Sequence, residues 1–323
     1  MRVVIALGGN AMTAADGNAR PESQRAAVER AAEPIADIVA GGHQVVLTHG
    51  NGPQVGNLLV KNELAASVVP PVPLDWCGAQ TQGTIGLLLL NALDRALAHR
   101  GRAVRTAALV SRTRVSVDDP GFAKPTKPIG RYLPGPQAAL MMEHGQSWQD
   151  RGERGWRRVV ASPEPLECLD SPAAVTLLNA GYLVVCAGGG GIPVVSDLDG
   201  TLRGIEAVVD KDLTAALLAL SLAADRLIIA TDVEQVVMGW ASQAPRPIGQ
   251  IRVSRLRELA DRGEFASGSM GPKVEAACRY AESSGRPAVI TSLERIRDAL
   301  RDSHGTVVLP DLETPASEGE LGA

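Results

Sequence analysis

Short runs of apolar, often β-branched residues alternate along this chain with longer stretches in which apolar residues recur at helical spacing. The short runs predict strands at residues 3–7, 44–48, 103–109, 183–186, 226–230, 288–291 and 306–309. The longer stretches predict helices at residues 21–40, 54–66, 81–99, 171–180, 211–223, 255–262, 273–283 and 293–300. Strands and helices that alternate in this way build βαβ units. The pattern therefore predicts a three-layer α/β/α sandwich around a mostly parallel open sheet.

The alternation breaks between residues 118 and 165, where prolines and polar residues are frequent and a core pattern is found only at the two ends. Long connections without secondary structure are uncommon inside a compact domain, so we interpret this segment as an inserted, lid-like subdomain. Residues 1–310 are expected to form one domain, whose two lobes share a sheet and meet near Gly188. Residues 311–323 combine proline, glycine, serine and acids, and we expect them to form a flexible tail.

The composition narrows the class of partner. The chain has 323 residues, a net charge of −4 and a pI near 5.8, with no block of basic residues. This argues against nucleic acid and against a membrane surface, and favours a small-molecule partner. The four cysteines include no C-x-x-C pair, which indicates neither a disulfide framework nor a zinc site and suits a reducing cytosol. The opening apolar run is too short for a signal peptide, and no apolar stretch approaches the ~20 residues that span a bilayer, so we expect a soluble, cytoplasmic protein.

Three glycine-rich turns come directly after predicted strands. They are Gly8-Gly9-Asn10, Gly50-Asn51-Gly52 and the glycine run 188–191, which includes Gly189 and Gly190. In an open parallel sheet the ligand lies beyond the carboxyl ends of the strands, and glycine lets backbone N–H groups approach phosphate oxygens. The alternative for each turn is steric, because tight turns after strands often need glycine without binding anything. The spacing fits neither the dinucleotide-binding fingerprint nor the P-loop.

Lysine is rare in this chain. Only five of the 32 basic residues are lysine, and Lys127, Lys211 and Lys273 lie in segments marked by glycine, proline or aspartate. A compact ammonium suits the charge that develops during phosphoryl transfer, whereas arginine offers a wider fork. Asp210, Lys211 and Asp212 open a predicted helix, where Asp210 could orient the lysines or a metal-bound water, although an ordinary helix cap would look the same. Together the three lysines predict catalytic cations for phosphoryl transfer.

These residues lie in segments that resemble the carbamate kinases, within the amino acid kinase superfamily. The matching segments run in family order over nearly the whole chain: ALGGNAM (6–12), THGNGPQVGN (48–57), PLDWCGAQTQGTIG (73–86), DDPGFAKPTKPIG (118–130), GWRRVVASPEP (155–165), AGGGGIPVV (187–195), GIEAVVDKDLTAALLA (204–219), ATDVEQV (230–236) and FASGSMGPKVEAA (265–277). The resemblance implies the reaction ATP + carbamate ⇌ ADP + carbamoyl phosphate with Mg²⁺. It also implies the amino acid kinase fold, an open α/β/α sandwich that usually forms a homodimer.

The resemblance further implies a role for each matching site residue. The transferred phosphoryl group and the carbamate would be held by Gly8, Gly9, Asn10, Gly50, Asn51 and Gly52. Lys127 would reach that site from the inserted subdomain, while the ATP phosphates would be bound by Lys211, with Asp210 beside it, and by Lys273. The nucleotide pocket would be lined by Gly189, Gly190, Thr231, Asp232, Val233 and Met270. Mg²⁺ would bind through the ATP phosphates, with no direct protein ligand. The acceptor-binding lobe would then span about residues 1–187 and the nucleotide-binding lobe about residues 188–310.

Two alternatives stay open at this point. Another acyl-phosphate kinase of the same fold would act on an amino-acid carboxylate, whose longer body needs contacts that a carbamate-sized pocket lacks. A non-catalytic nucleotide-binding regulator would lack one of the lysines or glycine turns, and none is missing here. The attacking oxygen of carbamate is already anionic, so the transfer needs no general base, and we expect His49 at its strand end to be held by a backbone hydrogen bond.

Overall fold

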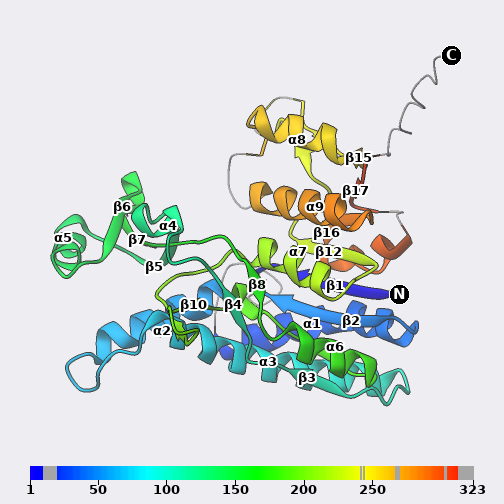
Figure 1. Ribbon diagram of the computed structural model, residues 1–323, viewed down its shortest axis with the longest axis horizontal. Helices are drawn as coiled ribbons and strands as arrows, with labels where there is room; N and C mark the ends of the chain where they lie inside the picture. Colours follow the sequence, from blue (N-terminus) through cyan, green and yellow to red (C-terminus); the bar gives the residue numbers. More distant parts are fainter. Residues whose placement is uncertain (10–19, 241, 243, 266–269, 302–303, 312–323) are drawn as a thin grey trace.

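The computed structural model describes residues 1–9, 20–240, 242, 244–265, 270–301 and 304–311, and these residues contain a central eight-stranded sheet (Figure 1). One half of the sheet contains β1 (Arg2–Leu7), β2 (Gln44–His49), β9 (Leu183–Val185) and β3 (Thr106–Ala108). The other half contains β12 (Arg226–Thr231), β16 (Ala288–Ser292), β17 (Thr306–Leu309) and β15 (Gln250–Arg252). The strand order is β15-β17-β16-β12-β1-β2-β9-β3, and neighbouring strands are parallel except for β16 and β17.

The side chains of β1 alternate between two helical layers. Val3, Ile5 and Leu7 pack with α1 (Pro21–Ala40) and α3 (Leu74–His99). Val4 and Ala6 pack with α7 (Lys211–Ser221) and α9 (Met270–Ser284), and α6 (Ser171–Asn179) and α8 (Val253–Asp261) extend that layer (Figure 1). A strand covered on both faces needs apolar residues at every position, which explains the continuous apolar runs in the sequence. The predicted three-layer sandwich is confirmed.

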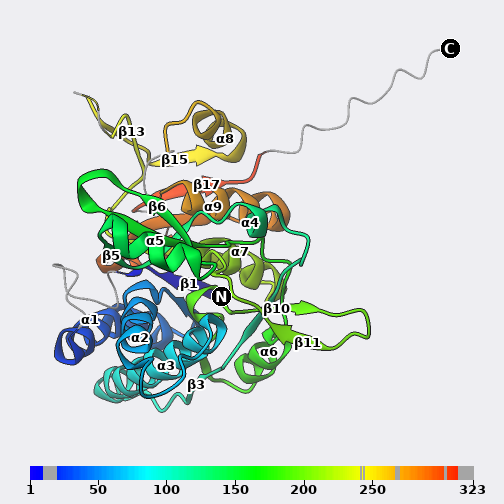
Figure 2. The ribbon, with the colours of Figure 1, turned by 90° about the vertical axis from the view of Figure 1, so that its left-hand side faces the viewer.

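The segment predicted as an insertion projects from one side of the main body (Figures 1 and 2). It contains α4 (Pro120–Ala123), β5 (Lys127–Leu133), α5 (Gly135–Glu143), β6 (Ser147–Asp150), η2 (Gly152–Arg154) and β7 (Trp156–Val160), and its strands pair antiparallel in the order β5-β7-β6. The middle of this segment, where the sequence shows no core pattern, has a small core of its own, in which Leu133, Ala138 and Trp148 are buried together. So few buried residues leave almost no periodic pattern in the sequence.

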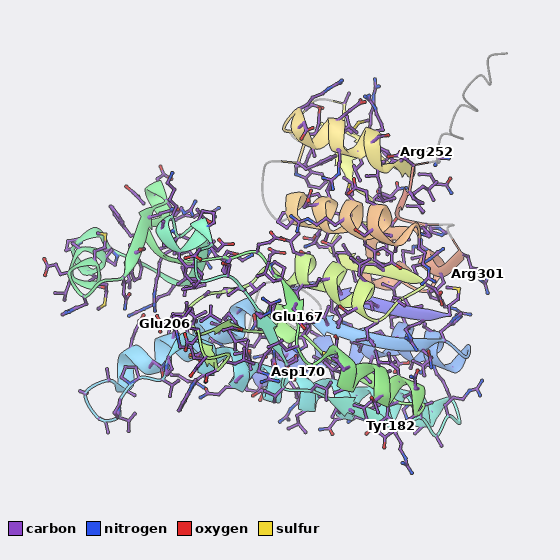
Figure 3. All side chains as sticks on the ribbon, viewed as in Figure 1. Glu167, Asp170, Tyr182, Glu206, Arg252 and Arg301 are labelled. Carbon is purple, nitrogen blue, oxygen red and sulfur yellow. The ribbon has the colours of Figure 1, made fainter. Side chains whose placement is uncertain are left out.

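The root of the inserted sheet is anchored on the main body. Ile129 and Val160 are buried in one cluster with Leu74 of α3 and with apolar residues of α2 (Gly52–Ala65). Glu206 lies near this junction (Figure 3), where its Oε1 accepts a hydrogen bond of 3.2 Å from the Leu74 amide and its Oε2 lies 3.5 Å from Arg158 Nη2. The insertion is therefore held at its base by both apolar and polar contacts.

Three parts of the chain differ from the sequence prediction. The predicted helix at 293–300 consists of two short 3₁₀ turns, η4 (Leu293–Arg295) and η5 (Asp298–Arg301), because the chain reverses here so that β17 can pair antiparallel with β16. α3 begins at Leu74 rather than at residue 81, directly after Pro73, whose restricted φ suits a helix start. The sequence also does not predict six short strands: β4 (Arg112–Arg114), β8 (Glu167–Cys168), β10 (Ile192–Ser196) and β11 (Leu202–Gly204) of a second sheet, and β13 (Val237–Met238) with β14 (Arg246–Pro247). Except for β10, each has three residues or fewer, which is too short to show a period of two.

Two expectations are not decided by this fold. Beyond Asp311, the predicted tail lies outside the described residues. The division into an acceptor-binding and a nucleotide-binding lobe stays a prediction. Within the described ranges, every helix is too short or too polar to cross a bilayer.

His49 ends β2, and its buried ring fixes the turn that follows. The residue is only 1% exposed, and its Nδ1 lies 3.0 Å from the Gly50 carbonyl oxygen. On the other side of the ring, a Cβ atom at Gly188 would lie 2.3 Å from Nε2, so this position has room only for glycine. Burial lowers the pKa of His49 to about 4, and the ring is therefore neutral near pH 7, with Nδ1 donating to the Gly50 carbonyl. The backbone hydrogen bond expected for His49 is confirmed.

We predict that His49 makes the fold sensitive to mild acid. Between pH 6.5 and pH 4 the unfolded chain can protonate this histidine while the folded chain cannot, so stability present near neutral pH is lost as the pH falls. This residue alone should lower the free energy of unfolding by about 2 kcal/mol between pH 7 and pH 5. Urea unfolding of the wild type and of His49→Gln at both pH values measures the effect. An equal pH dependence in the two proteins would contradict it.

Candidate active site

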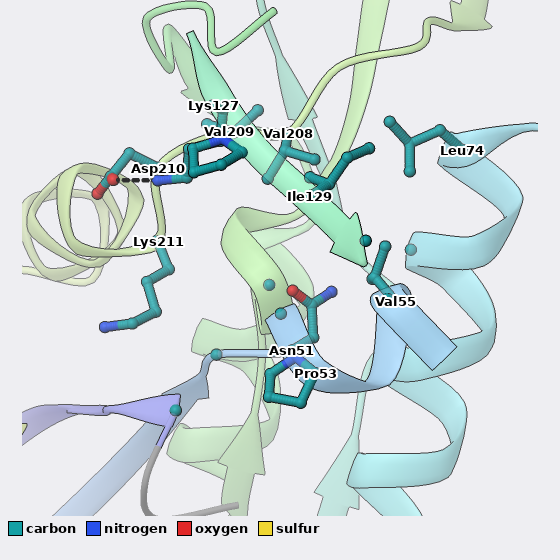
Figure 4. A pocket seen from close by; sticks show the side chains of 18 of the residues that line it. Asn51, Pro53, Val55, Leu74, Lys127, Ile129, Val208, Val209, Asp210 and Lys211 are labelled. Carbon is teal, nitrogen blue, oxygen red and sulfur yellow. Dashed lines mark hydrogen bonds and ion pairs between the residues drawn. The ribbon is translucent and has the colours of Figure 1, made fainter. Parts of the chain in front are cut away.

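A cavity of about 1090 Å³ lies beyond the carboxyl ends of β1, β2 and β9. The turns after these strands line it through residues that include Gly9, Gly50 and Gly189. The start of α7 and the first turns of α2 form two further walls, and β5 of the inserted sheet passes over them (Figure 4). Open parallel sheets bind their ligands at this edge, so the location agrees with the one predicted from the glycine turns.

Asp212 holds two lysines together at the start of α7. Its Oδ1 accepts a hydrogen bond of 2.6 Å from Lys211 Nζ, and its Oδ2 accepts one of 2.9 Å from Lys273 Nζ. Asp212 is 3% exposed and Lys273 is 4% exposed. Burial alone would raise the pKa of the Asp212 carboxyl, but the two ammonium groups lower it below its ordinary value. Burial, aided by the charge of Lys273, lowers the pKa of Lys211. One carboxylate therefore serves two cations, which leaves one positive charge uncompensated.

Asp210 links the start of α7 to the inserted sheet. Its Oδ1 accepts hydrogen bonds from the backbone amides of Asp212 at 2.9 Å and Leu213 at 3.3 Å, which is the geometry of a helix N-cap. Its Oδ2 accepts a hydrogen bond of 2.8 Å from Lys127 Nζ (Figure 4). The Lys127 side chain is 35% exposed, so water screens this ion pair and its contribution to stability is small. Lys127 is thus positioned at the cavity without being fixed there.

The glycine run after β9 adopts a backbone that few residues tolerate. The angle φ is +54° at Ala187, +68° at Gly189, +91° at Gly190 and +83° at Gly191. A Cβ atom at Gly191 would lie 2.0 Å from Thr113 Oγ1. The left-handed conformation costs alanine about 1–2 kcal/mol, so the surrounding structure has to hold Ala187 in place.

Buried polar side chains provide that restraint. Ser111 Oγ accepts a hydrogen bond of 2.7 Å from the Ala187 amide, and Thr48 Oγ1 donates one of 2.8 Å to the Ala187 carbonyl. Gln82 Nε2 donates to the carbonyls of Gly188 at 2.8 Å and Ser111 at 3.1 Å, while its Oε1 accepts from the Ser111 amide at 2.8 Å. All three polar side chains are buried. They fix the backbone of this turn at the floor of the cavity.

The three turns approach one another closely. A Cβ atom at Gly50 would lie 3.4 Å from the Gly9 amide nitrogen and 3.3 Å from Lys211 Cδ. A Cβ atom at Gly189 would lie 2.2 Å from Asn51 Nδ2. Glycine at positions 50 and 189 therefore allows backbones from three strand ends and one lysine stem to converge on the same small space.

Most of the predicted site residues meet at this cavity. It is lined by Gly9, Gly50, Asn51, Gly52, Lys127, Gly189, Asp210, Lys211 and Lys273. Its described lining does not include Gly8, Gly190, Thr231, Asp232, Val233 or Met270. Thr231 ends β12 at the same edge of the sheet, and Met270 begins α9, the helix that carries Lys273. Asn10 lies outside the described residues. The roles suggested for all these residues stay predictions.

Three residues of the site are not identified by sequence reasoning. Asp212 is recognised only as part of a charged helix start. Gln82 and Arg157, which lines the cavity from β7, are included only as members of longer family segments, with no role assigned to either. Gln82 offered one usable signal, a polar residue on the helix face that also carries the buried Ile85 and Leu89. Arg157 offered none, because its position depends on the fold of the inserted sheet.

The carboxylates of the cavity do not form a metal cage. Among the described residues, no group of three or more histidine, cysteine, aspartate or glutamate side chains could hold a metal ion. All four oxygens of Asp210 and Asp212 already accept hydrogen bonds from lysine ammonium or backbone N–H groups. A cation that arrives bound to the phosphates of a nucleotide fits this cavity, because it brings its own oxygen ligands.

The chain is similar to known proteins along nearly its whole length. The model of the family described as "Amino acid kinase family" matches residues 1–292. A carbamate kinase from Thermococcus kodakarensis is 42% identical over 95% of this chain and 99% of its own, and one from Trichomonas vaginalis is 39% identical over 96% and 100%. The solved structure of a carbamate kinase from Giardia lamblia bound to AMP-PNP is 40% identical, with a TM-score of 0.91 over 96% of this chain and 98% of that one. The chain belongs to the amino acid kinase family.

Proposed function

We propose that this chain is a carbamate kinase, which transfers a phosphoryl group reversibly between ATP and carbamate to give ADP and carbamoyl phosphate. The proposal rests on one observation above all: Lys127, Lys211 and Lys273 come from three separate elements and surround one cavity together with two aspartates. The identity of 39% and 42% to relatives named carbamate kinase, over nearly the whole chain, supports the choice of acceptor.

The charge of the transferring group explains the need for lysines. The phosphoryl group passes through a transition state whose charge spreads over its equatorial oxygens and the leaving group. Lys211 and Lys273, which share Asp212 and leave one positive charge, would offset the charge on the nucleotide phosphates. The positive end of α7 would add to this effect. Lys127 would leave Asp210 and contact the transferred group from the inserted sheet.

The proposed mechanism uses no general base, and the chemistry of the acceptor explains why none is needed. The attacking oxygen of carbamate is anionic, so no proton has to be removed from it. His49, the histidine behind the glycine turns, is buried, neutral near pH 7 and hydrogen-bonded to Gly50. Its role would be to shape the turn after β2, in which the Gly50 amide donates to the Leu7 carbonyl and the following backbone at Asn51 and Gly52 lines the cavity where the phosphoryl oxygens would bind.

The nucleotide would enter as its Mg²⁺ complex, in which the metal offsets charge on the β- and γ-phosphates. The rest of the nucleotide would lie toward Thr231, Asp232 and Val233 after β12 and toward Met270. Met270 and Lys273 both belong to the first turn of α9, so one helix start could contact the phosphates and the nucleoside together.

We also propose that the chain works as a homodimer in the cytoplasm. The homodimer rests on the family resemblance, and the cytoplasmic location rests on the cysteine pattern and the short apolar runs of the sequence. Light scattering on purified protein tests the first, since one chain has a mass of 33.7 kDa and a dimer would have twice that mass. A mass that stays at the value of one chain at all concentrations would exclude the dimer.

The deciding experiment combines purified protein, Mg²⁺, ADP and carbamoyl phosphate and measures the ATP formed with luciferase. We expect ATP only when both substrates are present. Acyl phosphates of glutamate and N-acetylglutamate serve as competing substrates. A higher kcat/KM with either of them would favour another acyl-phosphate kinase of this fold. Nucleotide binding without any turnover would favour a regulator.

We predict that Lys211→Ala lowers kcat by at least ~100-fold, because it removes a charge aimed at the transferring group. Asp212 keeps Lys273 as a partner, so the variant should remain folded. Lys61→Ala on the exposed face of α2 removes the same charge outside the cavity and should have nearly normal activity. Thermal unfolding of both variants checks that they are folded. Near-normal turnover of a folded Lys211→Ala variant would exclude Lys211 from the reaction.

We predict that Lys127→Arg is nearly as damaging as Lys127→Ala. A guanidinium can bind Asp210 through two parallel hydrogen bonds, so it would stay paired and would also replace a compact donor with a bulky fork. The loss should affect kcat and the KM for carbamoyl phosphate, with little change in the KM for ADP. Steady-state kinetics with each substrate varied in turn measures this. If Lys127→Arg kept most of the activity that Lys127→Ala loses, Lys127 would act only as a distant screening charge.

A further inference from the structure

Arg157 is a cation on the cavity wall whose charge is not offset. It lies on β7 of the inserted sheet and lines the cavity. In the described part of the chain, no carboxylate lies within ion-pair distance of its guanidinium, and its buried Nε has no hydrogen-bond partner. A buried donor left without an acceptor costs about 1–3 kcal/mol, so such a group requires an explanation.

The other cations of the cavity differ from Arg157 in this respect. Each described one has a carboxylate partner: Lys127 pairs with Asp210, Arg131 pairs with Glu63, and Lys211 and Lys273 share Asp212. Two positive charges are therefore uncompensated around the same space. One belongs to the lysine pair at the start of α7, and the other belongs to Arg157 on the inserted sheet.

Tyr132 holds the Arg157 side chain in place. Tyr132 lies opposite Arg157 in the pairing of β5 with β7, and the guanidinium carbon is 5.1 Å from the centre of the tyrosine ring. Hydrogen bonds from Arg154 and Arg157 lower the pKa of the Tyr132 phenol. A guanidinium held against a ring loses less freedom when it binds an anion, and its fork matches the oxygens of a carboxylate or a phosphoryl group.

We propose that Arg157 is a substrate-binding residue that donates hydrogen bonds to the anionic oxygens of the acyl substrate, carbamate or carbamoyl phosphate, from the inserted sheet. This inference rests on the proposed function, since the reaction brings two anions into one cavity. The lysine pair at the start of α7 would bind the nucleotide phosphates, and Arg157 would bind the second anion. An oxyanion bound by the guanidinium would offset the uncompensated charge on this wall of the cavity.

Kinetics of three variants tests the proposal. Arg157→Gln should raise the KM for carbamoyl phosphate at least tenfold while the KM for ADP changes less than twofold, and Arg157→Lys should lie between it and the wild type. Arg151→Gln is the matched control, because Arg151 is an exposed arginine of the same insertion outside the cavity. If Arg157→Gln raised the KM for carbamoyl phosphate no more than Arg151→Gln does, the proposal would be overturned. Equal rises in both KM values would also overturn it, since they indicate a general structural role.

A binding measurement separates this inference from the proposed function. Phosphonoacetamide, a stable analogue of carbamoyl phosphate, is titrated into the wild type, Arg157→Gln and Arg157→Lys in a calorimeter, which requires no turnover. We expect at least tenfold weaker binding to Arg157→Gln, and an intermediate value for Arg157→Lys. Equal affinity for the three proteins would exclude Arg157 as a contact even if the enzyme is active. Absence of ATP formation by the wild type would instead exclude the proposed function and leave the binding result to decide the role of Arg157.

Discussion

Two ammonium groups can lie side by side in a buried site only if a carboxylate between them offsets their repulsion, and the arrangement of this cavity depends on Asp212 for that reason. Each of its oxygens accepts from one lysine, Lys211 from the same helix and Lys273 from α9. The neighbouring Asp210 uses one oxygen to cap α7 and the other to hold Lys127. A short Asp-Lys-Asp helix start thus organises cations from three elements and still leaves positive charge for a phosphate.

The floor of the cavity depends on restraint of the backbone rather than on charge. The turn after β9 adopts the left-handed conformation at Ala187 as well as at glycines, and Ser111, Thr48 and Gln82 hold the start of this turn, at Ala187 and Gly188, by buried hydrogen bonds. Such bonds are costly to break, because each broken one would leave a buried polar group without a partner. Because these bonds restrain the turn before any ligand binds, a ligand that contacts it would have little backbone left to order.

Local pattern explains which parts of the molecule could be predicted from the sequence. The strands next to the centre contain continuous apolar runs, and the residues of each glycine turn and of the Asp-Lys-Asp helix start are contiguous, so each of these features can be recognised in the sequence. The positions of Gln82 and Arg157 in the cavity could not be predicted, because both depend on contacts that are distant in the sequence. Gln82 donates a hydrogen bond to Gly188, 106 residues away, and Arg157 is placed by the pairing of β7 with β5. The core of the insertion could not be predicted either, because it contains too few apolar residues to produce a periodic pattern in the sequence.

The insertion can serve the reaction through side-chain motion while its root stays docked. Ile129 and Val160 are buried against the main body, and Arg131 pairs with Glu63 of α2, so a rigid swing of the whole sheet would expose apolar surface and break that pair. Lys127 is different, because its partner Asp210 keeps two backbone hydrogen bonds when the lysine leaves. The Asp210 carboxylate would remain partly satisfied, which lowers the cost of moving Lys127 to an anion. In the proposed reaction, such a site would keep its walls fixed while Lys127 exchanges Asp210 for the substrate.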